Sequence, residues 1–182
     1  MSRYFQNYWS LTIVAGLVIA IDQATKYLVR QNLPFGGQWA PWDWLLPYAR
    51  IVHWNNSGAA FGMLPDLKAV FAILAVFVAI AIVYYYRQVP AEDWPLKLAM
   101  GMQCGGAIGN LIDRLLHDWH VTDFISVGNF AVFNVADASI SVGTVVLVIW
   151  VWYKERKEKQ AMGASAQAET PPALTPEEPV GE

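Results

Sequence analysis

The sequence has few charged residues: aspartate, glutamate, lysine and arginine make up only 15% of its 182 residues, whereas 55% are hydrophobic. Soluble domains usually carry about a quarter of charged residues, so the composition excludes an ordinary soluble domain and also a disordered chain. Cys104 is the only cysteine, which excludes an intrachain disulfide. The net charge of −3 shows no basic excess, and we therefore expect no nucleic-acid partner.

The sequence contains several long apolar segments. Crossing a bilayer as a helix requires about 20 apolar residues, and four segments meet this requirement: residues 9–33, 67–86, 96–116 and 135–153. Every proline before residue 160 falls between these segments, as expected because proline breaks helix interiors. The sequence predicts an all-α membrane protein with four transmembrane helices.

Basic residues next to the predicted spans indicate the orientation, because short cytoplasmic loops are enriched in lysine and arginine. Arg3, Arg87 and four basic residues after the last span place both termini inside; the four are Lys154, Arg156, Lys157 and Lys159. Loops 34–66 and 117–134 then face outside. Arg3 and the apolar run after it also resemble a cleaved signal peptide, but no small-x-small cleavage site follows.

Two further segments have distinct patterns. Residues 160–182 are rich in Ala, Pro and Glu and have no aromatic residue, so we expect a disordered acidic cytoplasmic tail after a membrane domain of residues 1–159. Within the long outer loop, residues 50–54 alternate polar and apolar side chains after a Trp-rich stretch. This alternation predicts a short strand on the membrane surface.

Polar groups at membrane depth are costly and are candidates for function. Two sets have i, i+3, i+4 spacing, so each lies on one helix face; they are Asp22, Thr25 and Lys26 in the first span and Asn110, Asp113 and Arg114 in the third. Both sets lie at the outer ends of their spans. Asp22, Lys26 and Asp113 fit locally compensated ion pairs and a functional role equally well.

Asp123 and Asp137 are harder to explain as ion pairs, since neither has a Lys or Arg within four residues in sequence. Two carboxyl groups in a partly dry site share one proton, which makes one a base and the other an acid. This is the chemistry of an aspartic protease, in which the base activates water and the acid polarises the scissile carbonyl without a metal or other cofactor. Asn134, one turn before Asp137, fits a helix cap as well as a site residue.

Other catalytic schemes fit less well. Cys104 has no histidine nearby and is interpreted as a packing residue. His117 and His120 have i, i+3 spacing, but two histidines without cysteine are weak signs of a metal site, and we expect no metal. Glycines 101, 105 and 109 recur every four residues, a pattern that lets membrane helices approach closely.

Five motifs in order carry a resemblance to a known family. They are DQATK (22–26), NSGAAF (56–61), GGAIGNLIDR (105–114), VTDF (121–124) and FNVAD (133–137). Over about residues 10–153 the sequence resembles lipoprotein signal peptidase, also called signal peptidase II. The resemblance implies a four-span aspartic endopeptidase of the bacterial plasma membrane that cleaves diacylglyceryl-modified prolipoproteins just before the lipidated Cys. It also implies a small extracytoplasmic β-cradle between the first two helices.

The resemblance assigns roles by motif. It implies that Asp123 and Asp137 are the catalytic pair, facing outside. Residues implied to bind substrate or support the site are Asp22, Lys26, Asn56, Gly58, Gly109, Asn110, Asp113, Arg114, Asn134 and Ala136. We expect lipid-modified prolipoproteins and membrane lipid as partners and a monomeric protein.

Two other classes of function fit part of the pattern. An ion-coupled transporter or channel subunit would also use intramembrane carboxylates, but it would place polar groups near the bilayer midplane, where the second and fourth spans have none. A structural scaffold would explain the glycine pattern and would leave Asp123 and Asp137 without a purpose.

Overall fold

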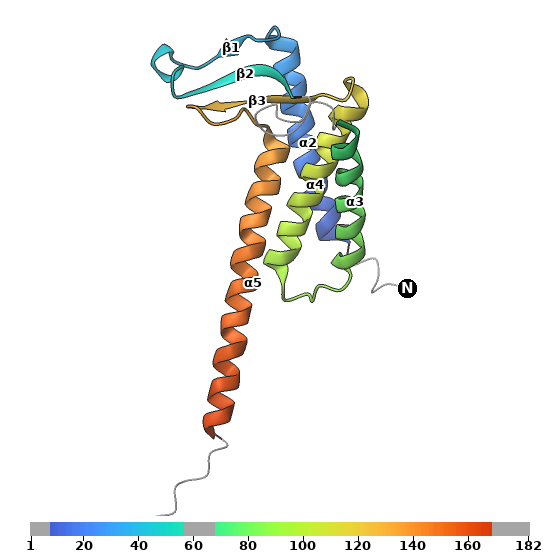
Figure 1. The fold of residues 1–182 in the computed structure, drawn as a ribbon, viewed down its shortest axis with the longest axis vertical. Coiled ribbons are helices and arrows are strands. Elements are labelled where there is room, and N and C mark those ends of the chain that lie inside the picture. Colours follow the sequence, from blue (N-terminus) through green and yellow to red (C-terminus); the bar gives the residue numbers. More distant parts are fainter. Residues whose placement is uncertain (1–7, 57–67, 169–182) are drawn as a thin grey trace, which may run out of the picture. The chain divides into compact units, whose positions relative to one another are not determined.

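The computed structural model describes residues 8–56 and 68–168, with Gly58 of the predicted site outside this range. The described part contains long helices and a small sheet (Figure 1). The helices are α2 (Trp9–Asn32), α3 (Lys68–Tyr86), α4 (Trp94–Leu116) and α5 (Val135–Ala168), with a short 3-10 helix η1 (Asp43–Leu45). The strands are β1 (Gln38–Trp39), β2 (Ala49–Asn56) and β3 (Val121–Val127). The chain divides into compact units at residues 1–147 and 148–182, and everything that concerns the site belongs to the first.

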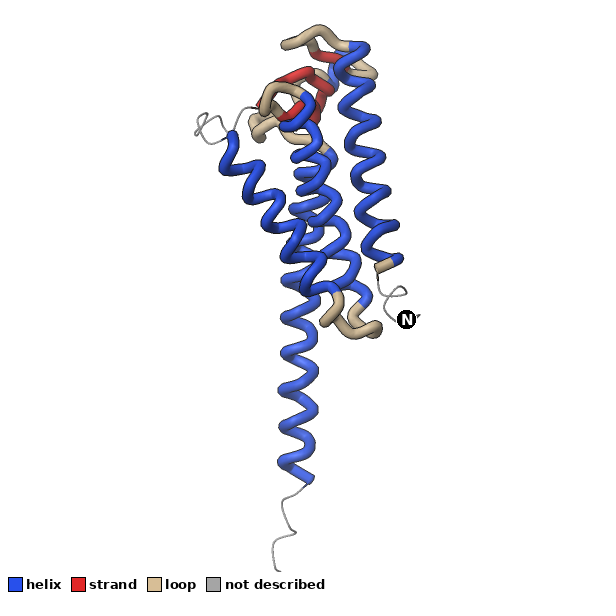
Figure 2. The backbone as a smooth tube through the Cα atoms, turned by 90° about the vertical axis from the view of Figure 1, so that its right-hand side faces the viewer, coloured by secondary structure: helices blue, strands red, loops and turns tan. Residues whose placement is uncertain are grey.

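Three helices in the described residues are long and apolar enough to cross a membrane: Trp9–Asn32, Ala69–Tyr86 and Val135–Met162. Helix α4 packs against both α2 and α3 (Figure 2), and it buries Asn110, Asp113 and several glycines. A helix covered by other helices needs less apolar surface than one that faces lipid, which explains its polar composition. The number of four spans stays a prediction.

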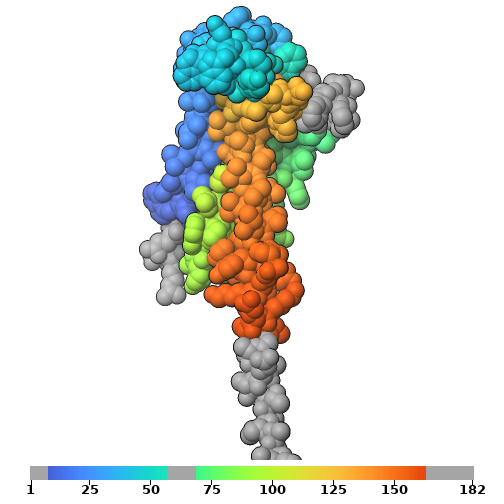
Figure 3. Space-filling view, turned by 90° about the vertical axis from the view of Figure 1, so that its left-hand side faces the viewer, coloured from blue at the N-terminus to red at the C-terminus, as the bar shows by residue number. Residues whose placement is uncertain are grey.

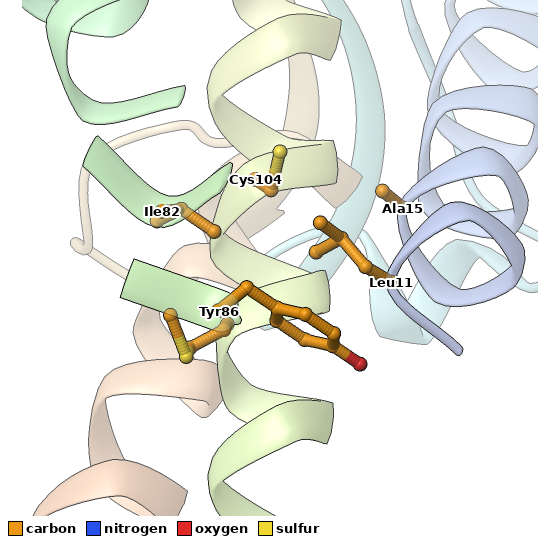
Figure 4. Packing of buried hydrophobic residues seen from close by; sticks show 6 residues of the cluster. Leu11, Ala15, Ile82, Tyr86 and Cys104 are labelled. Carbon is orange, nitrogen blue, oxygen red and sulfur yellow. The ribbon is translucent and has the colours of Figure 1, made fainter. Parts of the chain in front are cut away.

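The apolar core joins helices α2, α3 and α4 (Figure 4). It contains Leu11 and Ala15 of α2, Ile82 and Tyr86 of α3, and Cys104 of α4. Cys104 is buried there as a packing residue. The glycines of α4 allow the close approach, since a Cβ atom at Gly105 would lie 2.8 Å from the carbonyl oxygen of Ala15.

The sheet confirms the expectation of a small β-structure beside the helices. Its order is β1-β2-β3 with antiparallel pairs, and the predicted strand at residues 50–54 lies inside β2. The register shifts between Ile51, which pairs with Ile125, and Trp54, which pairs with Asp123. Such irregularities bend a strand and re-aim its side chains. Here the shift precedes Asn56, the last described residue of β2.

The segment after α2 forms the end of the molecule beyond that helix (Figure 3), and several of its aromatic side chains are exposed. The exposed ones are Phe35, Trp39, Trp42, Trp44, Tyr48 and Trp54. Such rings favour the interface between lipid and water, so the sheet is suited to that interface.

Helix α5 runs further than the sequence predicts. It ends at Ala168, so residues 160–168 of the segment expected to be disordered are helical. Alanine has the highest helix propensity, and Lys159 pairs with Glu155 one turn earlier at 2.7 Å, which supports this part of the helix. The rest of the expected tail, residues 169–182, lies outside the described residues.

Candidate active site

Asp123 of β3 and Asp137 of α5 line one cavity of about 500 Å³. The cavity is also lined by Asn56, Asn110 and Arg114, and by apolar side chains that include Phe130, Phe133 and Val142. Asn134 contacts Asp123 as well. The structure therefore brings the predicted carboxylate pair together with four of the residues expected to support it, which are Asn56, Asn110, Arg114 and Asn134. In this cavity, acidic side chains therefore lie beside apolar ones.

Asparagine amides hold both carboxylates. Asp123 accepts hydrogen bonds from Asn56 Nδ2 at 2.9 Å and from Asn134 Nδ2 at 2.7 Å. Asp137 Oδ1 accepts one from Asn110 Nδ2 at 2.8 Å. Within residues 8–56 and 68–168 neither carboxylate forms an ion pair. Neutral amides orient the pair without cancelling its charge.

The start of α5 fixes Asp137. Its backbone N–H donates to Asn134 Oδ1 at 2.9 Å, and Asp137 Oδ2 accepts from the Asn134 backbone N–H at 3.2 Å. This reciprocal arrangement is a capping box, which begins a helix at a defined residue. Asn134 therefore caps α5, and it also contacts Asp123.

Asp123 lies in an environment that favours its protonated form. Burial raises the pKa of Asp123 to about 7, and the charge of Asp137 raises it too. Hydrogen bonds from Asn56 and Asn134 and the charge of Lys26 oppose this rise. Near neutral pH this carboxyl group is therefore able to hold a proton.

The raised pKa predicts a pH-dependent stability. Since the folded-state pKa of Asp123 lies above the ordinary value of 3.8, the contribution is complete below about pH 4 and is lost as pH rises through 7. We expect the free energy of unfolding in detergent to fall by up to about 1.4 kcal/mol per pH unit between about pH 4 and pH 7, and to level off above pH 7. The variant Asp123→Asn is expected to show a flatter pH profile in thermal unfolding. Equal slopes for both proteins would contradict the assignment.

Asp22, Lys26 and Asp113 form a second cluster behind the cavity. All three side chains are fully buried, and Lys26 Nζ lies 2.8 Å from Asp22 Oδ2 and 3.4 Å from Asp113 Oδ2. They are compensated ion pairs, one of the two alternatives left open by the sequence. Lys26 Nζ also donates to Asn110 Oδ1 at 2.9 Å, so the cluster contacts an amide that holds Asp137.

Gly109 and Ala136, two of the residues expected to support the site, lie beside this cluster. The backbone N–H of Ala136 donates to Asp22 Oδ1 at 2.9 Å, which ties α5 to α2. A Cβ atom at Gly109 would lie 2.8 Å from Asp22 Oδ2, so a larger residue would displace the carboxylate.

Arg114 lies at the border between two cavities. It lines the cavity of the carboxylate pair and an adjacent one of about 310 Å³ with Phe71, Leu74 and Val78. Its Nη1 donates to the carbonyl oxygen of Asn110 at 3.2 Å, and its guanidinium lies 5.9 Å from the ring of Phe71. The positive charge of Arg114 can therefore orient an acidic or carbonyl group of a molecule bound at the border between these two cavities.

The structure adds residues that sequence reasoning missed. Gln23 Nε2 donates to the carbonyl oxygen of Gly109 at 3.0 Å, and Arg30 Nη1 donates to Thr122 Oγ1 at 2.9 Å. The signal for Arg30 was its spacing, because it follows Lys26 by four residues and continues the same helix face. No pattern identified its partner on β3.

Comparisons with known proteins agree with the geometry. The signal peptidase (SPase) II family matches residues 14–153. Lipoprotein signal peptidase of Moorella thermoacetica is 38% identical over 141 residues, covering 74% of this chain and 87% of the relative. That of Bacillus subtilis is 38% identical over 139 residues, covering 74% and 88%.

Solved structures of bacterial membrane enzymes share the fold. One has a TM-score of 0.73 at 28% identity and covers 80% of this chain and 88% of that chain. A second has a TM-score of 0.69 at 29% identity and covers 78% and 91%. Together with the sequence matches, which confirm the resemblance carried by the five motifs, they show that the chain belongs to the signal peptidase II family and is a peptidase of a bacterial membrane.

Proposed function

We propose that the protein is an aspartic endopeptidase that removes signal peptides from diacylglyceryl-modified prolipoproteins. Cleavage takes place before the lipidated cysteine at the outer face of the plasma membrane, with both termini of the enzyme in the cytoplasm. The observation that carries the proposal is the pair Asp123 and Asp137 in one cavity, held by amides and, in the part of the chain that the structure describes, not ion-paired with a cation. The names of the relatives support the substrate class.

The pair supplies general acid and base catalysis. The ionised carboxylate accepts a proton from a water molecule, whose oxygen then attacks the scissile carbonyl carbon. The protonated carboxyl group donates a hydrogen bond to the carbonyl oxygen and so stabilises the charge that develops there. Collapse of the tetrahedral intermediate passes a proton to the leaving amine. The elevated pKa of Asp123 supports a pair that holds a single proton near neutral pH.

The surroundings of the pair suit a lipid-modified peptide. Apolar side chains line both the cavity of the pair and the adjacent one beside α3, including Phe71, Phe130 and Val142. These walls can hold acyl chains, while Arg114 and the asparagine amides orient the peptide. Exposed aromatic residues of the sheet fit the membrane interface, which supports cleavage at that depth. One chain supplies both carboxylates, so the proposal requires only a monomer in the membrane.

Selectivity for the lipid tests the proposed substrate. Purified protein is incubated with a diacylglyceryl-modified preprotein and with the same preprotein unmodified, and the released signal peptide is measured. We expect cleavage of the modified form at a rate at least about a hundredfold higher, because the apolar contacts are made only with the acyl chains. The variant Asp137→Asn controls for contaminating peptidases. Equal rates for the two substrates would contradict the lipid-selective proposal.

A further inference from the structure

Arg30 lies outside the cavity, behind the strand that carries Asp123. It is in the last turn of α2, with a side chain 19% exposed. Its Nη1 donates to Thr122 Oγ1 at 2.9 Å and lies 3.5 Å from Asp113 Oδ1. Thr122 is the residue immediately before Asp123.

Thr122 is held at several of its polar atoms. Its backbone N–H donates to Asp113 Oδ2 at 2.8 Å, while its hydroxyl oxygen accepts from Arg30. Both Thr122 and Asp113 are almost fully buried. Arg30 and Asp113 thus form a clamp on Thr122, with one contact to its backbone and one to its side chain.

The clamp acts on the opposite face of β3 from the cavity. Successive side chains of a strand point to opposite faces, so the side chain of Thr122 points away from the face that presents Asp123. A contact on Thr122 therefore fixes where the carboxyl group of Asp123 lies without entering the cavity.

This end of β3 needs such a restraint. The register with β2 shifts between Ile51 and Trp54, so the ladder is interrupted beside Asp123. The turn before β3 has positive φ angles at Asp118 (49°) and Trp119 (64°), a conformation unfavourable for residues other than glycine. This end of β3 is paired with β2 through three residues, Val121, Thr122 and Asp123, and the contacts of Thr122 with α2 and α4 add to this restraint.

Arg30 does more than neutralise Asp113, because its Nη1 lies closer to Thr122 Oγ1, at 2.9 Å, than to Asp113 Oδ1, at 3.5 Å. Within the described residues, the hydroxyl oxygen of Thr122 accepts a hydrogen bond from the side chain of Arg30. We propose that Arg30 is a positioning residue for hydrolysis: through Thr122 it sets the place of the Asp123 carboxyl group. The inference rests on the proposed function, in which Asp123 belongs to the catalytic pair.

The test compares kcat and KM for a diacylglyceryl-modified preprotein in the full-length protein and four variants. We expect Arg30→Gln and Thr122→Val each to lower kcat about 10- to 100-fold, because a small misplacement of a catalytic group has effects of this size. KM is expected to stay within about twofold, since neither residue lines the cavity. Thr122→Ser keeps the hydroxyl and is expected to retain most of kcat. The double variant Arg30→Gln/Thr122→Val is expected to be no slower than the slower single variant, because both act through one contact.

Arg50→Gln is the matched control. Arg50 lies on β2 and donates to the carbonyl oxygen of Leu46, away from Thr122 and Asp113, so its kcat is expected to match that of the unaltered protein. Thermal unfolding in detergent is recorded for every variant. If Arg30→Gln does not fold, the nearly isosteric Thr122→Val carries the test.

Several outcomes would overturn the inference: an unchanged kcat in Thr122→Val, equal losses in Thr122→Val and Thr122→Ser, or additive losses in the double variant. Asp123→Asn is assayed in parallel to separate this inference from the proposed function. If Asp123→Asn is inactive and Thr122→Val is fully active, only the positioning role is wrong. If Asp123→Asn cleaves at the unaltered rate, the proposed function itself fails.

Discussion

Replacing Asp123 with asparagine is expected to lower kcat about 10²- to 10⁴-fold, the range that a positioned acid or base contributes to a reaction. Asparagine has the same shape but cannot exchange a proton with water or with the scissile carbonyl. Asp137→Asn is expected to lose a similar factor, because the two carboxyl groups act as one unit. The measurement is single-turnover cleavage of a diacylglyceryl-modified preprotein by purified protein.

The control for this experiment is Asp43→Asn, the same chemical change at an exposed residue of η1. It is expected to cleave at the unaltered rate. Binding of the lipidated substrate is expected to survive in Asp123→Asn, since the apolar walls of the cavity are unchanged. Cleavage at the unaltered rate by either cavity variant would show that the pair is not catalytic.

The second large effect concerns stability. Lys26→Met is expected to lower the free energy of unfolding by about 3–5 kcal/mol, because it leaves buried carboxylates without their cation. Lys26 contacts both Asp22 and Asp113, and all three side chains are fully buried. Methionine occupies a similar volume, so the loss reports the charge and not a cavity. Reversible unfolding in detergent measures it.

The chain contains a matched ion pair for comparison. Lys159 and Glu155 have the same i, i+4 spacing and a similar distance, 2.7 Å against 2.8 Å, but their side chains are 73% and 59% exposed. Lys159→Met is expected to change stability by less than about 0.5 kcal/mol. The double variant Lys26→Met/Asp22→Asn is expected to recover part of the loss, since Asp113 keeps Arg30 nearby. If Lys26→Met is no more harmful than Lys159→Met, the buried cluster does not stabilise the fold.

Much of the architecture follows from the sequence because membranes restrict what a chain can do. The predicted spans at residues 9–33, 67–86 and 96–116 agree closely with α2, α3 and α4. Their agreement comes from apolar length and from prolines placed between helices. The convergence of Asp22, Lys26 and Asp113 was also predictable, since charges at such a depth must meet partners.

The sheet was less predictable. Strand β1 has two residues, and β3 contains the polar residues Thr122 and Asp123 that suggest a loop when seen alone. Their burial depends on α2 and α4, which the local sequence does not specify. The role of Arg30 was missed for the same reason: helical spacing gives its face on α2 but not the strand against which that face packs.

The hydrogen bonds around the carboxylate pair have a consequence for the path of the proton. Each of the four carboxylate oxygens of Asp123 and Asp137 accepts a hydrogen bond from an N–H group of an asparagine. An amide N–H can donate but cannot accept, so this inner shell offers no place for a proton to go. Among the groups at residues 8–56 and 68–168 that bond to the pair, these amides cannot take a proton, which leaves the other carboxylate or a molecule in the cavity as its acceptor. In the proposed mechanism, these donors would therefore direct the transfer of the shared proton toward the peptide bond and water.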